Sequence, residues 1–136
     1  MKILVTGSSG FIGSHLTEYL VERGYGVVAF DRYNNNNHYG WLEKSKYKKK
    51  IEFILGDIRD YDSVNKAMKS CQSVMHLAAL IGIPYSYISP TAYIKTNVEG
   101  TLNVLESAKN LKLKQVIITS TSEVYGTAIK KKLSEN

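Results

Sequence analysis

The fold of this chain is decided by its first residues, Met1-Lys2-Ile3-Leu4-Val5-Thr6-Gly7-Ser8-Ser9-Gly10-Phe11-Ile12-Gly13. The apolar run from Ile3 to Val5 is typical of a buried strand, and glycines follow at every third position. Gly7 allows a sharp turn, Gly10 lets backbone N–H groups approach a pyrophosphate, and Gly13 lets a helix pack close to the strand. A helix that starts here presents unpaired N–H groups to phosphates. The stretch predicts a dinucleotide site; the alternative is a glycine-rich turn that binds nothing.

A second strand is expected over residues 27–30, and it ends at Asp31, about 20 residues after the glycines. An acidic side chain at this point can bind the ribose hydroxyls of an adenosine, and its charge repels a ribose 2′-phosphate. Asp31 therefore predicts NAD as the cofactor. The adjacent Arg32 is the argument for NADP, because an arginine at this position can hold that phosphate.

The composition excludes several other classes of protein. The chain has 136 residues, which predicts one domain over residues 1–136, and its net charge of +6 includes lysine runs at 48–50 and 130–132. Such runs are typical of solvated surfaces, and no basic stripe with interleaved aromatic residues indicates nucleic acid. The single Cys71 cannot form an internal disulfide, and we find neither a signal peptide nor an apolar run that could span a bilayer. We expect a soluble cytoplasmic protein that binds no nucleic acid and no membrane.

Segments with strand character and segments with helix character alternate along the chain. The asparagine run at 34–37 predicts a loop, and Trp41 begins a short helix or an irregular turn. Further strands are expected over residues 52–55, 73–77 and 115–119, and helices over residues 11–24, 61–70 and 89–111. This alternation predicts an α/β fold with a parallel sheet and helices on both faces. With the glycine turn it indicates a Rossmann-type doubly wound parallel sheet, truncated to about five strands, whose order in such folds is 3-2-1-4-5.

Asp57 and Ile58 follow the third expected strand, at the edge of the sheet where open α/β folds bind their ligands. Asp57 can accept a hydrogen bond from an adenine amino group while Ile58 covers the ring. The alternative role of Asp57 is to cap the turn before Asp60. The residue types alone do not decide between these two interpretations.

The fourth expected strand ends with Leu77 at the same edge of the sheet. Ala78 and Ala79 come next and are small where a cofactor has to pass, with tight packing as the alternative. His76 lies within an apolar segment, which favours a core histidine with satisfied hydrogen bonds over a ligand or a base. Since no second histidine, cysteine or carboxylate stands at metal-ligand spacing, no metal is predicted.

Five motifs occur in order along the chain: Thr6-Gly-x-x-Gly-Phe-Ile-Gly13, Gly56-Asp-Ile-Arg-Asp60, His76-Leu-Ala-Ala79, Asn97-Val-x-Gly-Thr101 and Ser120-Thr-Ser-Glu-Val-Tyr-Gly126. As a set they resemble the extended short-chain dehydrogenase/reductases, specifically the NAD-dependent nucleotide-sugar epimerases and dehydratases. The resemblance covers essentially the whole chain. It implies that the cofactor-binding residues are Gly7, Ser9, Gly10, Phe11, Ile12, Gly13, Asp31, Arg32, Asp57, Ile58, Leu77, Ala78, Ala79, Asn97 and Ser120.

The residues after the fifth strand distinguish the reactions within that family. Thr121-Ser122-Glu123 is similar to the 4,6-dehydratases, which have an acidic residue two positions after the active-site Ser/Thr, whereas 4-epimerases have small residues there. In a dehydratase, oxidation at sugar C4 acidifies the C5 proton, a carboxylate removes it, water leaves from C6 and the hydride returns to C6. The resemblance implies that Thr121 hydrogen-bonds the C4 oxygen and that Glu123 is the base at C5. Outside this family, a strand-end hydroxyl and a surface carboxylate would be the simpler interpretations.

Two details narrow the resemblance among the dehydratases. Ser122, the third catalytic candidate, stands where dTDP-glucose dehydratases have an aspartate, and the trio is closer to the Thr-Ser-Glu of GDP-mannose 4,6-dehydratases. The stretch from His76 to Pro90 is closer still to dehydratases that act on nucleotide-linked N-acetylglucosamine in legionaminic-acid biosynthesis. On that match, Ser86 is expected near the substrate diphosphate or sugar.

The family's acid–base pair, Tyr-x-x-x-Lys, does not occur in the chain. Tyr125 and Tyr47 have Ile129 and Ile51 at the partner position. Without a tyrosine whose pKa is lowered by that lysine, we expect hydride abstraction to be very slow. The family's C-terminal substrate region has no counterpart either. We therefore expect the N-terminal part of an extended enzyme, as a truncated gene, a fragment or one portion of a split protein, with an exposed sheet edge.

The leading hypothesis is the cofactor-binding part of a nucleotide-sugar 4,6-dehydratase, acting on a GDP- or UDP-N-acetylhexosamine. The missing Tyr-x-x-x-Lys pair motivates a second hypothesis, a module that binds NAD without catalysis. A third is a nucleotide-sugar 4-epimerase, against which Glu123 argues. The resemblance further implies a homodimer formed through the long helix over residues 89–111.

Overall fold

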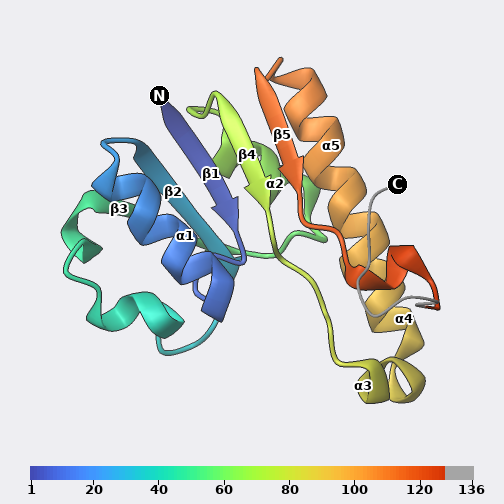
Figure 1. Ribbon diagram of the computed structural model, residues 1–136. Coiled ribbons are helices and arrows are strands. Elements are labelled where there is room, and N and C mark those ends of the chain that lie inside the picture. The colour runs from blue at the N-terminus through green and yellow to red at the C-terminus, as the bar shows by residue number, and fades with distance from the viewer. Residues whose placement is uncertain (128–136) are drawn as a thin grey trace.

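A computed structural model describes residues 1–127 of the chain, which form a parallel sheet with helices on both faces (Figure 1). The sheet order is β3-β2-β1-β4-β5, and every neighbouring pair is parallel. The strands are β1 (Lys2–Thr6), β2 (Gly26–Arg32), β3 (Ile51–Gly56), β4 (Ser73–His76) and β5 (Gln115–Ile118). This confirms the predicted Rossmann-type sheet and its strand order.

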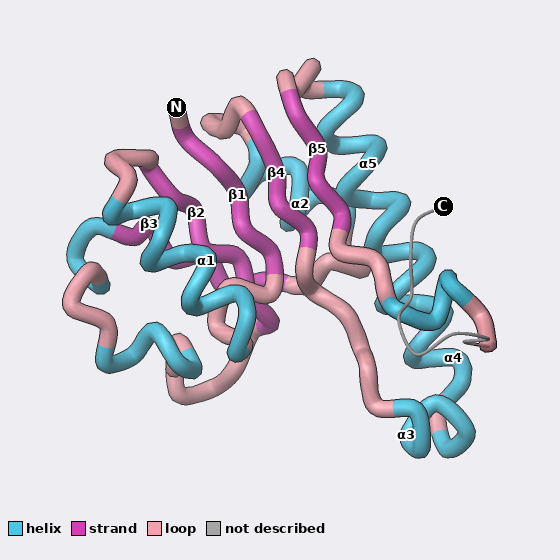
Figure 2. Tube along the Cα trace, viewed as in Figure 1, coloured by secondary structure: helices cyan, strands magenta, loops and turns pink. Residues whose placement is uncertain are grey.

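The helices form two layers around the sheet. On one face α1 (Phe11–Glu22) packs with Ile3 and Val5 of β1, and on the other face α2 (Tyr61–Met68) and α5 (Gly100–Asn110) pack with Leu4. The alternation along β1 is what buries both faces, because successive strand residues point to opposite sides. The remaining helices, α3 (Ile83–Ile88) and α4 (Pro90–Tyr93), lie beyond the carboxyl ends of the strands (Figure 2).

The prediction of one continuous helix over residues 89–111 was wrong in one respect. The helix begins at Pro90, one residue after the predicted start, but Ile94–Glu99 between α4 and α5 is a π-helical segment, in which the Gly100 N–H donates to the Lys95 carbonyl five residues back. The apolar spacing could not reveal this extra residue per turn. The short helix α3 was also not predicted. Elsewhere the predicted helices begin correctly and end two residues early, at Glu22 and Met68.

The glycine turn between β1 and α1 is held by backbone contacts that leave no room for side chains. Gly7 has a φ of +70°, and a Cβ there would lie 2.8 Å from the Ala78 nitrogen. A Cβ on Gly13 would lie 2.1 Å from the Gly7 carbonyl oxygen, far inside van der Waals contact. The structure therefore confirms the sharp turn at Gly7 and the close helix–strand packing at Gly13.

The strand β5 forms one edge of the sheet described here, with β4 as its only neighbour among residues 1–127 (Figure 1). Its side chains are exposed, and Ile117 keeps 43% of its surface accessible. The lysine run at 130–132 lies outside the described residues. Within the described part of the chain, no helix is both long and apolar enough to cross a membrane.

We predict that Gly13→Ala destabilises the fold by about 3 kcal/mol, because the added methyl group overlaps the Gly7 carbonyl. Gly10→Ala is the matched control, since its methyl group would lie 3.4 Å from the same oxygen and cost about 1 kcal/mol or less. Urea unfolding of both variants measures the difference. Equal stability of the two variants would contradict the packing role of Gly13.

Candidate functional site

A cavity of about 1060 Å³ lies at the carboxyl ends of the strands. Most of the predicted site residues line it, although they come from segments far apart in the sequence. They are Gly7, Gly10, Phe11, Ile12, Gly13, Asp31, Arg32, Asp57, Ile58, Leu77, Ala78, Ala79, Ser86, Asn97, Ser120 and Thr121. Three predicted site residues do not line the cavity: Ser9, Ser122 and Glu123.

The glycine turn presents backbone donors at one end of this cavity. The Gly7 N–H donates to the Phe30 carbonyl at 2.9 Å, which ties the turn to the end of β2. Gly10 occupies the N-cap position of α1, and no side chain of residues 1–127 caps that helix. The first turn of α1 also contains no acidic residue. The helix start therefore keeps N–H groups and a partial positive charge available for an anionic ligand.

Asp31 is held on one side only. Its Oδ2 accepts hydrogen bonds from the Ser8 hydroxyl, from the Ser9 N–H at 2.9 Å and from the Ser9 hydroxyl at 2.7 Å. Its Oδ1 accepts no hydrogen bond from any other residue among 1–127, so it is free to accept one from a ligand. Burial raises the pKa of the Asp31 carboxyl, and the bonds from Ser8 and Ser9 oppose that rise. Sequence analysis did not identify Ser8, because a serine in a glycine turn has no distinctive pattern.

The Asp57 carboxylate is bound by Arg59, two residues later in the same turn. Its carboxylate pairs with the Arg59 guanidinium, with 2.5 Å between Oδ2 and Nη2, and accepts the Arg59 N–H at 2.9 Å. The Arg59 guanidinium holds the pKa of this carboxyl below its usual range. The cap of α2 comes from Asp60, whose Oδ1 accepts the Asp62 N–H. Ile58 is only 6% exposed and packs against Gly100, so little of it faces the cavity.

The loop after β4 forms a second wall of the cavity and is held by side chains from two other elements. The Thr6 hydroxyl oxygen accepts the N–H groups of Leu77 and Ala78, each at 3.2 Å. The Asn97 side chain grips Leu80 with both ends of its amide, accepting the Leu80 N–H and donating to the Leu80 carbonyl, each at 2.8 Å. Asn97 therefore shapes this wall through Leu80. Thr6 was quoted within a motif, but the sequence did not indicate what it does.

His76 is a buried histidine with both ring nitrogens hydrogen-bonded, as the sequence predicted. Nδ1 lies 2.6 Å from the Thr6 hydroxyl oxygen, and Nε2 lies 3.0 Å from the Thr101 hydroxyl oxygen. Burial lowers the pKa of His76 from 6.5 to about 4, so the ring is neutral at physiological pH. No group of three His, Cys, Asp or Glu residues within residues 1–127 could hold a metal ion.

The catalytic candidates are only partly brought to the cavity. Thr121 lines it and also caps the 3₁₀ turn Ser122–Tyr125, since its hydroxyl oxygen accepts the Glu123 N–H at 3.3 Å. Ser122 and Glu123 are exposed on that turn. Ser86 lines the cavity from α3 and donates its hydroxyl to the Ile83 carbonyl at 2.7 Å.

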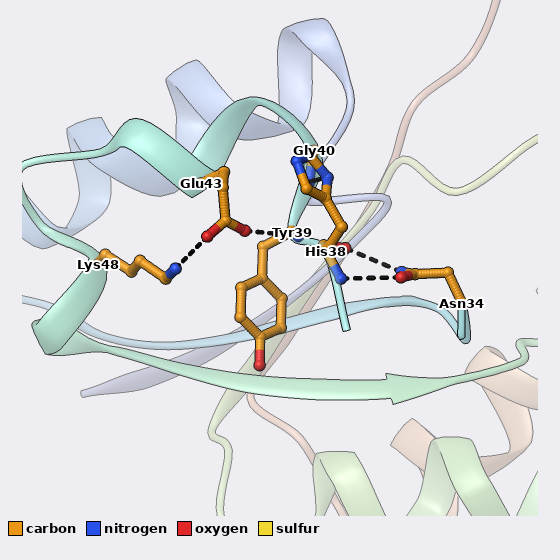
Figure 3. A network of polar contacts seen from close by, with 6 residues as sticks. All are labelled: Asn34, His38, Tyr39, Gly40, Glu43 and Lys48. Atoms are coloured by element: carbon orange, nitrogen blue, oxygen red, sulfur yellow. Dashed lines mark hydrogen bonds and ion pairs between the residues drawn. The ribbon is translucent and has the colours of Figure 1, made fainter. Parts of the chain in front are cut away.

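The segment after β2 braces the glycine turn from outside the cavity. A polar network, drawn in Figure 3, orders it: Asn34 exchanges two hydrogen bonds of 2.8 Å with His38, and the Gly40 N–H donates to the His38 ring at 3.0 Å. The following Trp41 N–H donates to the Ser9 carbonyl at 3.1 Å. A Cβ on Gly40, which has a φ of +54°, would lie 2.4 Å from that oxygen. This contact supports Ser9, one of the residues that hold Asp31.

Known proteins share this fold and much of this sequence. A family model described as GDP-mannose 4,6 dehydratase matches residues 4–136. The UDP-N-acetyl-alpha-D-glucosaminuronate decarboxylase of Bacillus cytotoxicus is 40% identical, over 92% of this chain and 38% of its own length. The UDP-glucuronate 4-epimerase 4 of Arabidopsis thaliana is 37% identical, over 99% of this chain and 32% of its own length.

A solved structure agrees with these matches. The UDP-glucose-4-epimerase of Stenotrophomonas maltophila, crystallised with bound NAD and formylated UDP-arabinopyranose, superposes with a TM-score of 0.88 at 28% identity. The match covers 99% of this chain and 41% of that one. The chain thus spans less than half the length of each of these relatives.

We predict that Ser8→Ala raises the pKa of Asp31 further, because the Ser8 hydroxyl bond stabilises the charged carboxylate. A pH titration of the Asp31 carboxyl carbon by NMR measures this shift. Ser14→Ala is the matched control, because its hydroxyl donates to the Phe11 carbonyl and does not touch Asp31. An Asp31 pKa that is the same in both variants would contradict the role given to Ser8.

Proposed function

Because the chain belongs to the NAD-dependent epimerase/dehydratase family of extended short-chain dehydrogenase/reductases, we propose that its cavity binds NAD for hydride transfer at C4 of a nucleotide-linked sugar. One observation carries this proposal. A single cavity is lined by the glycine turn, Asp31, the loop after β4 and Thr121. In doubly wound folds the glycine turn and the acidic residue after the second strand hold a dinucleotide, and ligands bind in the crevice at the carboxyl ends of the strands.

The residues present fit a dinucleotide in charge and in space. The uncapped start of α1 suits a pyrophosphate, and Gly10 keeps side-chain atoms away from that point. The Oδ1 of Asp31, which accepts no hydrogen bond from residues 1–127, suits a ribose hydroxyl, because a carboxylate oxygen can accept a hydrogen bond from that hydroxyl. Ala78 and Ala79, whose side chains are single methyl groups, line the cavity and leave space for a ligand. The NAD bound to the similar Stenotrophomonas epimerase supports the same ligand here.

Asp31 also supports NAD over NADP. A second anion next to this carboxylate would be repelled, and the repulsion is strengthened where the carboxylate is shielded from solvent. Arg32 lines the same cavity and is exposed, so it is the residue that could accept a ribose 2′-phosphate. The fixed orientation of Asp31 by Ser8 and Ser9 favours the carboxylate as the dominant contact.

For the reaction we propose 4,6-dehydration, with Thr121 and Glu123 as the acting residues. Bound NAD would supply a hydride acceptor for oxidation at C4, and its reduced form a hydride donor to C6. Thr121 would hold the C4 oxygen through its hydroxyl, which is supported by its place at the cavity. Glu123 would take the C5 proton as water leaves from C6, with Ser122 beside it on the same turn. The family model that matches residues 4–136 supports this choice.

Two other functions are supported by specific observations. A 4-epimerase is supported by the similar Arabidopsis and Stenotrophomonas proteins, whose names give that activity. A module that binds NAD without turnover is the other proposal, and it needs only the cavity lined by the glycine turn and Asp31. Among these, the acidic Glu123 favours the dehydratase over the epimerase.

The substrate and the assembly follow from the same family. We propose a nucleotide sugar as substrate, with Ser86 on the cavity wall near its diphosphate or sugar. We also propose a homodimer through the π-helical segment and α5, because Val98 in the former and Leu102 and Leu105 in the latter expose apolar side chains.

We predict that the chain binds NAD more tightly than NADP and that Asp31→Asn reduces or abolishes this preference. The amide keeps the shape of the side chain but removes the charge that repels a 2′-phosphate. Isothermal titration calorimetry with both cofactors measures the two dissociation constants. Asp62→Asn, an equally conservative change at the start of α2, should leave them unchanged. Tighter binding of NADP by the unaltered chain would contradict the proposal.

We predict that Glu123→Gln lowers formation of the 4-keto-6-deoxy sugar by about 100-fold or more, the usual contribution of a general base. The assay needs a form of the enzyme that also supplies a Tyr-x-x-x-Lys pair, on the same polypeptide or on a partner. Glu22→Gln, at the end of α1 and outside the cavity lining, serves as the control. Full activity of Glu123→Gln would favour the 4-epimerase, and turnover by the 136-residue chain alone would exclude a purely binding module.

A further inference from the structure

A chain of hydrogen bonds between side chains crosses the molecule from β1 through β4 to α5. Thr6 and His76 are almost completely buried, with 0% and 3% of their surfaces exposed. The Thr6 hydroxyl oxygen lies 2.6 Å from Nδ1 of His76, and the Thr101 hydroxyl oxygen lies 3.0 Å from Nε2. The Thr101 hydroxyl also lies 2.7 Å from the Asn97 carbonyl oxygen. None of these side chains has a role in the proposed hydride transfer.

The partners fix the position of every proton in this series of hydrogen bonds. A carbonyl oxygen can only accept, so the Thr101 hydroxyl must donate its proton to Asn97. Thr101 can then only accept from His76, which places the ring proton on Nε2. A neutral ring leaves Nδ1 as an acceptor, so the Thr6 hydroxyl must donate to it. The Thr6 hydroxyl oxygen has two lone pairs left, and they accept the Ala78 N–H and the Leu77 N–H, which the Thr6 carbonyl oxygen also accepts at 3.2 Å.

We propose that His76, as the neutral Nε2–H tautomer between Thr6 and Thr101, is a positioning residue that sets the cofactor-facing loop Leu77–Leu80 against the glycine turn. It acts through the Thr6 hydroxyl on one side and through Thr101 on the other. This role rests on the proposed binding of NAD in the cavity.

The hydrogen bonds at Thr6 control the distance between two walls of the cavity, the loop after β4 and the glycine turn. The Ala78 N–H that Thr6 holds belongs to the nitrogen that would lie 2.8 Å from a Cβ on Gly7. The loop and the glycine turn therefore touch backbone to backbone, and a small shift of Ala78 would change the space for a pyrophosphate. With Nδ1 unavailable as an acceptor, the Thr6 proton would lose its partner, and the hydroxyl would have to turn away from one of its two N–H donors.

The hydrogen bonds at Thr101 control the other end of the loop Leu77–Leu80, at Leu80. Thr101 bonds the Asn97 carbonyl, and the Asn97 amide grips Leu80 at both its N–H and its carbonyl. Asn97 lies in the π-helical segment Ile94–Glu99, so its backbone is outside the regular α-helical register. The Thr101 hydroxyl gives this segment a fixed anchor to β4. His76 is thus the link between the two ends of the loop.

The electrostatics of the site are consistent with this proton order. Burial lowers the pKa of His76 to about 4, so the ring carries one proton at neutral pH. A second proton would sit on Nδ1 and face the Thr6 oxygen, whose lone pairs are both in use.

The first measurement is the ¹⁵N NMR spectrum of the 136-residue chain with labelled histidine at pH 7. We expect His76 to show a protonated Nε2 and a bare Nδ1, and the proton on Nδ1 would overturn the proposal. This measurement needs no ligand, so it remains decisive even if NAD does not bind. Failure of the unaltered chain to bind NAD would instead count against the proposed function.

The second measurement compares Thr101→Val, which removes the hydroxyl at constant shape, with Thr101→Ser, which restores it. We expect Thr101→Val to shift the Leu77 and Ala78 amide resonances and to weaken NAD binding about tenfold, the value of one buried hydrogen bond. Thr101→Ser should restore both to near the original values. If Thr101→Val only lowers the unfolding temperature and leaves the NAD affinity and the amide resonances unchanged, His76 is merely structural and the proposal is wrong. Should Thr101→Val not fold, Thr101→Ala takes its place in the same comparison.

Discussion

The contact between the Gly13 Cα and the Gly7 carbonyl is the constraint on which the rest of the structure depends. Because Gly13 has no Cβ, α1 can approach the end of β1 and bury its apolar side chains against Ile3 and Val5. The same turn touches the Ala78 backbone at Gly7, which brings the loop after β4 to the glycines. The glycine turn and the loop after β4, two segments about seventy residues apart in the sequence, therefore meet at one point, and the cavity opens there.

Hydroxyl groups then convert this packing into a defined binding surface. Among residues 1–127, Ser8 and Ser9 hold one oxygen of Asp31, the other oxygen accepts no hydrogen bond, and no cationic side chain pairs with the carboxylate. Thr6 does the same for the loop after β4 by accepting two of its N–H groups. A neutral hydroxyl can orient a group without adding charge, which matters where an anionic ligand is to be bound next to a carboxylate. The brace from Trp41 to Ser9 extends this support to the segment after β2.

Much of this arrangement could be predicted from the sequence, and what could not has identifiable physical reasons. The glycine spacing and the alternation of strands and helices were sufficient for the elements of the fold, because they report local geometry and burial directly. The strand order followed from the doubly wound topology that accompanies such a glycine turn. The roles of Ser8, Thr6 and Thr101 depend on partners up to about seventy residues away, and hydroxyl residues have no spacing that reveals them. The π-helical segment was missed because one extra residue in a turn barely alters an apolar pattern. Glu123 was chosen by resemblance, and its exposed turn shows how little a sequence motif says about where a side chain points.

The central claim is that the glycine turn and the loop after β4 together hold NAD. Backbone amide chemical-shift mapping during an NAD titration tests it most directly, because it locates the ligand residue by residue. The claim predicts that the largest shifts fall on Gly7, Gly10, Gly13, Asp31 and Ala78, at the carboxyl ends of the strands. Shifts confined to the opposite end of the sheet, around Tyr25 and Gln115, or no shifts at saturating NAD, would contradict it.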